Sequence, residues 1–289
     1  HHTTAMGSLC AVWAFQSDAD QGNVWCGRDT GCPCWRGGGG TCWGAAYWAI
    51  HRRLSKNTGL GGNDVDPYIE IKNISKRFGH KRVLEAVSLS VERGQTVGLV
   101  GANGSGKSVL FKILCGFVKP DQGSVYVRGA QLGKNGRDFP EDLGVFINSP
   151  GFIGIYSGFR NLKFLADIQG KIGEEEIKAA MSKVGLDPKD KTKVEHYSLG
   201  MKQKLGLAQA IMEGQDILVL DEPFNALDHQ TYEDMKMLIR MLKAEGKTIF
   251  LTSHRFKDIE QLCDQVYFLE EGRLAPITEE IAAYYRELV

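Results

Sequence analysis

The stretch "GANGSGKS", Gly101 to Ser108, decides the fold. It fits the pattern G-x-x-x-x-G-K-[ST] at every defined position. The apolar run "TVGLVG" (Thr96 to Gly101) precedes it and is typical of a buried strand, while "SVLFKILCGF" after it has the spacing of an amphipathic helix. A glycine-rich turn between a strand and a helix is the context that a phosphate-binding loop requires. The alternative, a turn that binds nothing, is disfavoured because both flanks are in place.

The residue types in this loop point to a nucleoside triphosphate and a metal ion. Glycines let backbone N–H groups curl around a phosphate without clashes of Cβ atoms. Lys107 is predicted to reach the β and γ phosphate oxygens of ATP, and the Ser108 hydroxyl to ligate Mg²⁺. The residues predicted to bind the nucleotide here are Gly101, Asn103, Gly104, Ser105, Gly106, Lys107, Ser108 and Val109.

A second run, "DILVLDEP" (Asp216 to Pro223), delivers two acids at the end of a buried strand. Ligands of open α/β sheets bind at the carboxyl ends of the strands. Asp221 is therefore expected to hold Mg²⁺, directly or through water, and Glu222 to polarise the attacking water as a general base. The alternative is a strand end with two solvated acids.

A third buried run, "TIFLTSH" (Thr248 to His254), places a histidine at its end. A lone histidine at a strand end is usually a surface residue. Its place beside the other strand ends favours contact with the γ-phosphate, so His254 is a candidate catalytic residue together with Glu222 and Lys107.

The stretch "YSLGMKQKL" (Tyr197 to Leu205) reads as a small-residue turn that opens a helix, and such a helix start is a second place where an anion binds. The alternative is an ordinary helix cap by Ser198.

Elsewhere, "YIEIKNI" (68–74) alternates as an edge strand would, "VLEAVSLSV" predicts another strand, and "QVYFLEEGRLA" predicts a hairpin. Between Asn161 and Leu186 the spacing is helical, with Leu162, Phe164, Leu165 and Ile168 on one face, and a second helix is predicted over Glu174 to Val184.

Composition limits the possible classes of protein. Of the 289 residues, 43% are hydrophobic and 24% charged, which permits a large core and argues against wholesale disorder. Lys plus Arg and Asp plus Glu number 35 each, so no global charge favours nucleic acid, and no nucleic-acid partner is expected. No apolar run approaches the roughly 18 residues that span a bilayer. We therefore expect a cytoplasmic chain whose membrane role, if any, runs through a partner.

The chain changes character near residue 66. All five tryptophans and five of the seven cysteines lie before that point, and "HHTTAMGS" looks like the remnant of a purification tag and its linker. The cysteine spacing matches no usual zinc arrangement. Residues 1–66 are interpreted as a tag remnant plus a Cys/Trp/Gly-rich segment and a linker, accessory or added for expression; a small Cys-rich interaction module and a metal site stay as alternatives.

The P-loop, the serine–glycine turn, "VLDEP", "NALD" and "TSH" follow one another in an order that resembles an ABC transporter nucleotide-binding subunit, from about Tyr68 to Leu288. The resemblance implies an α/β fold: a P-loop NTPase ABC cassette with a RecA-like core, an antiparallel β subdomain and a helical subdomain. The cassette is expected over 67–289, with its helical subdomain at about 148–213. It also implies an ATP hydrolase that requires ATP and Mg²⁺.

The resemblance assigns roles to further residues. Two cassettes associate head to tail in that family, so Ser198 and Gly200 of one copy would contact the γ-phosphate held by the other. Leu199 stands where the first of two glycines is usual, and Met201 replaces the usual glutamine. The remaining matches are Phe78, which would stack on adenine, Asp228 of "NALD", which would communicate across the dimer, and Asn148 of "FINSPGF", which falls where a glutamine or glutamate contacts Mg²⁺ or the lytic water. Asparagine is one methylene shorter, so its contact could run through water.

"FINSPGF" together with "YSLGMKQKLGLAQA" is similar to the bacitracin-resistance and lantibiotic-immunity branch. This implies export of a peptide, drug or similar substrate through a separate transmembrane permease, with a homo- or heterodimer of cassettes on the inner face of the membrane. The permease groove is expected near Asn148 to Tyr156, where Phe152, Ile155 and Tyr156 would offer exposed apolar side chains, with core packing as the alternative.

A non-transport ABC ATPase that acts on a macromolecular partner is the rival reading, disfavoured because the chain has one cassette, no basic linker and no room for an inserted coiled coil.

Overall fold

The computed structural model describes residues 67–147 and 151–287, which belong to one compact unit, Asp66–Val289. The predictions for residues 1–66 and for Asn148 lie outside the described residues. Within the described ranges, no helix combines the length and apolar character needed to cross a bilayer.

The core of the fold is a six-stranded sheet in the order β10-β9-β3-β8-β7-β6. Five of its strands, β9 to β6 in that order, are parallel, and β10 pairs antiparallel with β9 at one edge, as the predicted hairpin requires. Every residue of β3, β7 and β8 is buried, which explains why these strands are almost continuously apolar in the sequence. The strands are β3 (Thr96–Val100), β6 (Leu143–Phe146), β7 (Ile217–Leu220), β8 (Thr248–Thr252), β9 (Gln265–Glu270) and β10 (Arg273–Pro276).

A second, antiparallel sheet has the order β2-β1-β4-β5. Its strands are β1 (Ile69–Phe78), β2 (Lys81–Val91), β4 (Gln122–Val127) and β5 (Ala130–Gln131). The prediction that residues 68–74 form an edge strand is wrong, because β1 pairs with β2 on one side and with β4 on the other. The alternation that suggested an edge has another cause: one face of this sheet covers the core and the other meets solvent.

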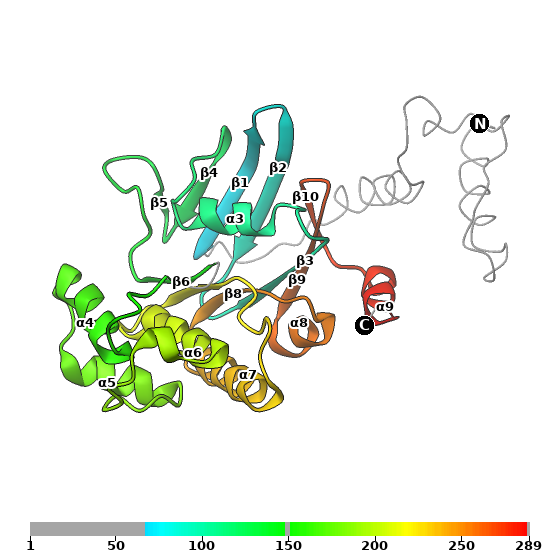
Figure 1. The fold of residues 1–289 in the computed structure, drawn as a ribbon. Helices are drawn as coiled ribbons and strands as arrows, with labels where there is room; N and C mark the ends of the chain where they lie inside the picture. The colour runs from blue at the N-terminus through cyan, green and yellow to red at the C-terminus, as the bar shows by residue number, and fades with distance from the viewer. Residues whose placement is uncertain (1–66, 148–150, 288–289) are drawn as a thin grey trace, which may run out of the picture. The chain divides into compact units, whose positions relative to one another are not determined.

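Helix α3 (Lys107–Leu114) lies between the two sheets (Figure 1), and its apolar side chains share one core with both. Phe111 of α3 meets Phe250 of β8 edge to face, with ring centroids 6.2 Å apart. Each fully buried Leu, Ile or Phe side chain stabilises the fold by about 1.5–3 kcal/mol. The P-loop helix is therefore anchored on both sides.

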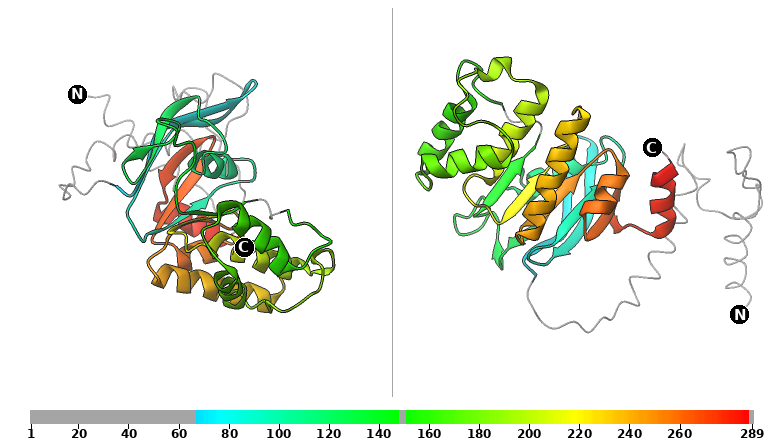
Figure 2. Two further views of the ribbon diagram at one scale, coloured as in Figure 1. Left: turned by 90° about the vertical axis from the view of Figure 1, so that its left-hand side faces the viewer. Right: turned by 90° about the horizontal axis from the view of Figure 1, so that it is seen from below.

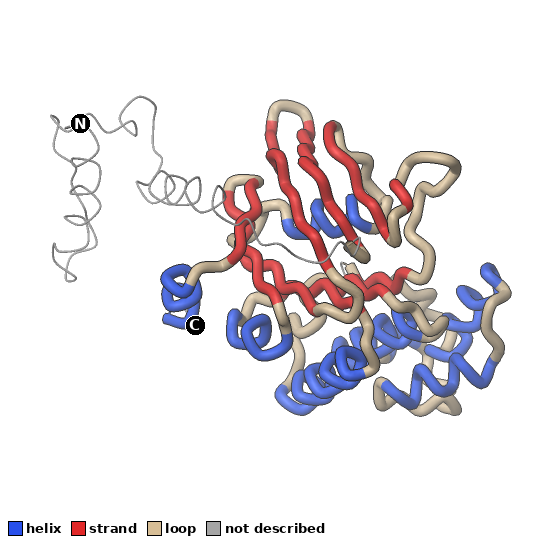
Figure 3. Tube along the Cα trace, turned by 180° about the vertical axis from the view of Figure 1, so that it is seen from behind, coloured by secondary structure: helices blue, strands red, loops and turns tan. Residues whose placement is uncertain are grey.

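The helices at residues 199–211, 229–244 and 256–262 cover the opposite face of the large sheet, as Figures 2 and 3 show, whereas the other helices pack beside them. The side chains of the central strands alternate accordingly: Val219 and Phe250 face α3, whereas Leu218 and Leu251 pack among the helices. These helices are α4 (Gly158–Gln169), α5 (Glu174–Lys183), α6 (Leu199–Ile211), α7 (His229–Ala244), α8 (Phe256–Leu262) and α9 (Glu279–Glu287), with a 3₁₀ turn, η2 (Val194–His196).

Helices α4 and α5 lie where the helical spacing was predicted, but the predicted face of α4 is wrong in part. Leu162 is buried and Leu165 packs partly buried against the core, whereas Phe164 and Ile168 are 36% and 79% exposed. Residues 164 and 168 are one turn apart, so they share one exposed stripe of the helix.

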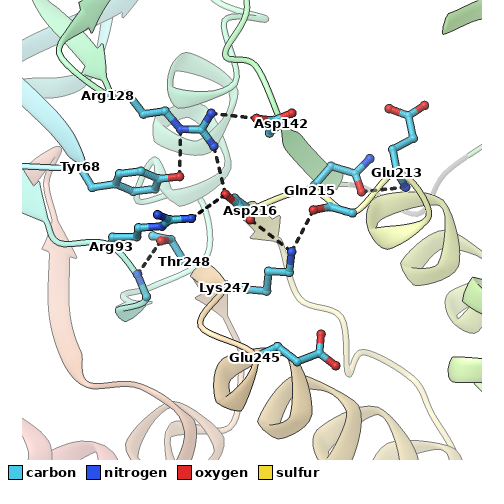
Figure 4. Close-up of polar contacts among 12 residues, drawn as sticks. Tyr68, Arg93, Arg128, Asp142, Glu213, Gln215, Asp216, Glu245, Lys247 and Thr248 are labelled. Atoms are coloured by element: carbon cyan, nitrogen blue, oxygen red, sulfur yellow. Dashed lines mark hydrogen bonds and ion pairs between the residues drawn. The ribbon is translucent and has the colours of Figure 1, made fainter. Parts of the chain in front are cut away.

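A charged cluster joins the two sheets at the end opposite the P-loop (Figure 4). Arg128, just after β4, donates to Tyr68, to Asp142 at 2.8 Å and to Asp216 at 3.4 Å. Arg93 and Lys247 also reach the carboxylate of Asp216, at 3.1 and 3.3 Å. The hydrogen bond from Arg128 to Asp142 is the main cause that raises the pKa of Arg128. The cluster ties the antiparallel sheet to the start of β7.

Gly144 of β6 provides a test of this packing. A Cβ atom there would overlap the carbonyl oxygen of Ala210 in α6 and come within 2.7 Å of Leu218. Gly144→Ala should therefore lower the free energy of unfolding by about 1–3 kcal/mol, measured by urea denaturation. Gly151→Ala, where no atom lies within 4 Å of the new Cβ, is the matched control and should leave the midpoint unchanged. Equal midpoints for the two variants would contradict the described packing of α6 on β6.

Candidate functional site

The predicted site residues come together because neighbouring parallel strands end at one edge of the sheet. The strands β3, β8, β7 and β6 are adjacent, with Leu99 paired to Thr252, Leu220 to Leu251 and Phe146 to Leu220. Their carboxyl ends lead respectively into the P-loop, His254, the Asp221–Glu222 pair and the segment that contains Asn148. Asn148 itself lies outside the described residues.

The P-loop has the backbone of an anion cradle. Gly101 has φ 152° and Gly106 has φ 112°, conformations that side chains resist, and a Cβ at Gly101 would overlap the carbonyl oxygen of Leu269. No side chain of the described structure caps the start of α3, and its first turn contains no acidic residue. The first N–H groups of the helix are thus available to an anion. The buried Ser105 hydroxyl also has no hydrogen-bond partner among the described residues. The cradle fits a phosphate group.

Lys107 folds back into this cradle. Its buried ammonium group donates to the carbonyl oxygens of Gly101 at 2.7 Å and of Ala102 at 3.1 Å. Burial lowers the pKa of Lys107, and the charges of Glu222 and Asp221 oppose that shift. The ammonium group therefore lies within electrostatic reach of both acids, and a phosphate would supply the negative charge that loop carbonyls lack.

One hydroxyl orients both acidic residues. Thr252 donates through Oγ1 to the Asp221 carboxylate at 2.7 Å and accepts from the backbone N–H of Glu222 at 2.8 Å. Glu222 has φ 53°, in the left-handed region that residues with a side chain avoid. Such strain persists only where the surroundings enforce it and is common at functional sites. The Thr252 hydroxyl holds the N–H of Glu222 in this conformation, and the carbonyl of Glu222 accepts from the N–H of Asn225 at 3.2 Å.

His254 closes the arrangement. Its Nε2 atom lies 2.6 Å from a carboxylate oxygen of Glu222, and its ring is half exposed at the sheet edge. The structure thus brings His254, Glu222, Asp221 and Lys107 to one place, although they come from three strand ends.

A magnesium ion at this edge would need help from the nucleotide. Within the described ranges, no group of three or more His, Cys, Asp or Glu side chains is arranged to hold a metal. Ser108 in the first turn of α3 and Asp221 offer one hydroxyl and one carboxylate. Oxygen donors of this kind, completed by phosphate oxygens and water, suit Mg²⁺.

Phe78 is half exposed at the end of β1. It pairs with Lys81 of β2, and two residues further along β2, Val83 packs against Gly106 of the P-loop. The half-exposed ring of Phe78 thus lies on the hairpin that borders the phosphate cradle, with the Lys76 ammonium group 5.4 Å from its centroid, and stacking on a base stays a prediction.

Ser198 and Asp228 are helix caps in this single chain. Ser198 accepts from the backbone N–H of Met201 at 3.2 Å and starts α6, which is the plain alternative raised from the sequence. Asp228 accepts from the N–H and the hydroxyl of Thr231 at the start of α7, and these bonds lower the pKa of Asp228. A Cβ on Gly200 would come within 3.1 Å of Thr231, so the two helix starts pack directly together.

Thr252 and Ser253 are site residues that sequence reasoning left without a role. Ser253 donates to Asp258 at 3.2 Å and accepts from the N–H of Arg255 at 3.1 Å. The available signal was two hydroxyl residues directly before a histidine at a strand end. Thr252 bonds to Asp221, which is distant in the sequence, and Ser253 bonds to Asp258 on the next helix. The spacing of residues in the sequence does not reveal either contact.

Comparison with known proteins places this site in a family. The family model described as "ABC transporter" matches residues 84–225. The chain is 39% identical over 219 residues to the uncharacterized ABC transporter ATP-binding protein YybJ of Bacillus subtilis (strain 168), covering 76% of this chain and 99% of that one. It is 35% identical over 207 residues to the bacitracin transport ATP-binding protein BcrA of Enterococcus faecalis (71% and 68%). It is 34% identical over 206 residues to the lantibiotic transport ATP-binding protein SrtF of Streptococcus pyogenes (71% and 88%).

Solved structures agree. A structure of the ATP-binding subunit of an ABC transporter superposes with a TM-score of 0.66 at 27% identity, covering 76% of this chain and 93% of that one. A bacterial ABC transporter cassette solved as a dimer gives 0.63 at 22% identity (71% and 96%), which supports the fold. The molecule is therefore a P-loop ABC cassette, as the sequence resemblance implied. The chain belongs to the family of ABC transporter ATP-binding proteins and is an ABC-type ATPase.

Thr252→Val tests the geometry of the acids. Valine keeps the shape of threonine but removes both hydrogen bonds to the Asp221–Glu222 turn. Because a hydrogen bond to a charged group contributes about 1.5–3 kcal/mol, kcat for ATP hydrolysis should fall at least about tenfold, measured by phosphate release at saturating ATP.

Thr248→Val is the matched control for that measurement. Thr248 lies at the other end of β8, is fully buried, and its hydroxyl accepts from the N–H of Gly94 at 2.9 Å. The same substitution there should lower stability without changing kcat. If both variants, or neither, lost turnover, Thr252 would have no special role at the site.

Proposed function

We propose that this chain hydrolyses ATP to drive export of a peptide or drug-like compound through a separate membrane subunit. The observation that carries the proposal is the Glu222–His254 contact beside the P-loop, at one edge of the sheet. The similarity to ATP-binding proteins named for bacitracin and lantibiotic transport supports the class of substrate.

The proposed roles follow from the chemistry of each group. The P-loop and Lys107 bind the phosphates of ATP, and Phe78 stacks on its base. When bound, Mg²⁺ would supply positive charge against the phosphate oxygens; Ser108 and Asp221 would hold it, and Asn148 is the further ligand expected from the sequence, directly or through water. Glu222 removes a proton from the attacking water. His254, which contacts Glu222 in this structure, turns its Nε2 proton to the γ-phosphate once ATP is present.

The second anion site serves another copy of the cassette. The Ser198 hydroxyl uses a lone pair to accept from Met201, so its own proton stays free to donate to a phosphate oxygen. Capping α6 and binding a partner's γ-phosphate are therefore compatible roles for one side chain. Gly200 and Asp228 border the same surface through Thr231. Two copies, identical or not, would enclose two ATP molecules.

The membrane subunit docks on the apolar docking surface, which we define as Ile153, Ile155, Tyr156, Phe164 and Ile168. Ile155 is 58% exposed, and Tyr156 meets Phe164 with ring centroids 5.1 Å apart. The expectation that Phe152 is exposed is wrong, because it packs partly buried against the core, and Tyr156 is half-buried. The exposed apolar side chains of this stretch are instead Ile153 and Ile155, which lie between Phe152 and Tyr156.

Two sets of hydrogen bonds hold this surface rigidly. The buried amide of Asn161 accepts from the N–H of Ile153 at 2.8 Å and donates to the carbonyls of Ile153 and Ser157 at 3.1 and 3.0 Å. The backbone of residues 154–156 also pairs with Val194 and Glu195, which lie just before the turn at Ser198. Docking and the second anion site are thus directly connected.

The chain would sit at the inner face of the membrane through this partner, with 67–289 as the cassette and 1–66 as an accessory segment.

Glu222→Gln tests the paired site. Glutamine keeps the shape of the side chain but cannot take a proton, so the variant should bind ATP, fail to hydrolyse it and remain as a dimer on gel filtration. Adding Lys107→Ala removes phosphate binding and should restore the monomer. A Glu222→Gln monomer that retains bound ATP would contradict the composite site.

Aspartate at Ile155 and Ile168 tests the apolar docking surface. Burying a charge without a partner is costly, so the double variant should lose most of its co-purification with the native membrane subunit, while ATPase turnover stays unchanged. Met237→Asp is the control, since Met237 is 63% exposed on α7, outside the surface. Equal recovery of the membrane protein with both variants would place the docking site elsewhere.

A further inference from the structure

A buried charged cluster lies behind the loop that carries His254. We call Tyr232, Lys236, Ser253 and Asp258 the Asp258 cluster. Asp258, Lys236 and Ser253 are all buried. None of the proposed steps in ATP binding or hydrolysis uses these groups, and they come from two helices and one loop: α7, α8 and the segment after β8.

The carboxylate of Asp258 is the centre of the cluster. One oxygen accepts from the Tyr232 hydroxyl in a short hydrogen bond and lies 3.3 Å from the Lys236 ammonium group. The other accepts from the Ser253 hydroxyl at 3.2 Å. Burial, with a smaller contribution from Asp258, raises the pKa of Tyr232 to about 12, so the phenol stays a donor at neutral pH.

Simple attachment of α7 to α8 does not require such a cluster. Taking a charged pair out of water is costly, and apolar side chains of similar size often stabilise as much or more. Two turns further along α7, Lys243 already bonds to the carbonyl of Leu262 at 2.9 Å and to Asp264 at 2.6 Å, without complete burial. A buried pair with directional hydrogen bonds instead fixes a geometry.

The geometry fixed is that of the His254 loop. Thr252 and His254 both bond toward the Asp221–Glu222 turn, whereas Ser253 between them bonds to Asp258. This alternation is that of an extended chain, whose successive side chains point to opposite sides. Asp258 therefore holds the loop from behind at the residue next to the histidine.

Tyr232 also reaches the turn that follows Glu222. Its ring meets Phe224 with centroids 5.5 Å apart, and the Arg255 guanidinium lies 4.8 Å from the same ring. One side chain of α7 thus contacts both the segment after the base and the residue after the histidine. Asp228, at the start of α7, is one turn before Tyr232.

We propose that the Asp258 cluster is a positioning site, in which Tyr232 and Asp258 hold His254 against Glu222 and couple its position to helix α7. The inference rests on the proposed function for the roles of Glu222 and His254. Because α7 begins at the residue assigned to the contact between cassettes, a displacement of this helix on pairing reaches His254 through Tyr232. None of the cluster's residues touches ATP in this scheme; they act through His254.

Tyr232→Phe is the first test. It removes one hydroxyl and keeps the ring against Phe224. Loss of a hydrogen bond to a buried carboxylate should lower kcat about tenfold. The Kd for ATP, measured by equilibrium binding to the full chain, should change less than about twofold, because the P-loop and Phe78 are untouched. Ser253→Ala, which frees the loop from the other side, should give the same pattern and replaces Tyr232→Phe if that variant does not fold.

Lys243→Met is the matched control. It removes the neighbouring ion pair between α7 and the end of α8, so it should lower Tm without lowering kcat. Turnover that falls equally in Lys243→Met would show that general loosening of α7 explains the loss, and would overturn the inference.

A double-mutant cycle separates this inference from the proposed function. If Tyr232 acts through His254, Tyr232→Phe should cause less than about a twofold further loss of kcat in the His254→Ala background. A full tenfold further loss would overturn the positioning role and leave the proposed function standing. Wild-type turnover of His254→Ala alone would instead remove His254 from the proposed hydrolysis and this inference with it.

Discussion

Parallel pairing of β3 with β8 and of β8 with β7 is the constraint on which the site depends. Strands that run the same way must end at the same edge, so three segments far apart in the sequence meet there. The Thr252 hydroxyl then sets the fine geometry, because it bonds to both Asp221 and the backbone of Glu222. These two levels, strand direction and one shared hydrogen bond, bring the residues proposed for hydrolysis together at one edge of the sheet.

Much of this architecture could be predicted because its signals are local. The P-loop has a fixed pattern between a strand and a helix, and Asp221, Glu222 and His254 each end an apolar run. The helices α4 and α5 also follow from periodicity. The predictions that were wrong depended on which elements are neighbours in space. The residues of β1 alternate in polarity whether the strand lies at an edge or inside a sheet. Phe164 and Ile168 are apolar whether or not another helix covers them.

The Asp258 cluster belongs to the part that could not be predicted. Tyr232, Lys236 and Asp258 read along the sequence as ordinary residues of two amphipathic helices. Only the packing of α7 beside the end of β8 turns them into a buried network. The end of β8 is consequently hydrogen-bonded on two sides. Thr252 bonds to Asp221 of the site, and the adjacent Ser253 bonds to Asp258 of the cluster.

The amide of Asn161 gives the apolar docking surface a mechanical property. By bonding to both ends of the loop from Ile153 to Ser157, it removes most of the loop's conformational freedom before any partner arrives. A partner that binds such a preformed loop loses little entropy in ordering it. The backbone of this loop also hydrogen-bonds to Val194 and Glu195. A movement of the loop would therefore be transmitted to these two residues, because the loop itself has little freedom to bend. A displacement of this loop by a partner would therefore reach the 3₁₀ turn Val194–His196, which lies shortly before Ser198.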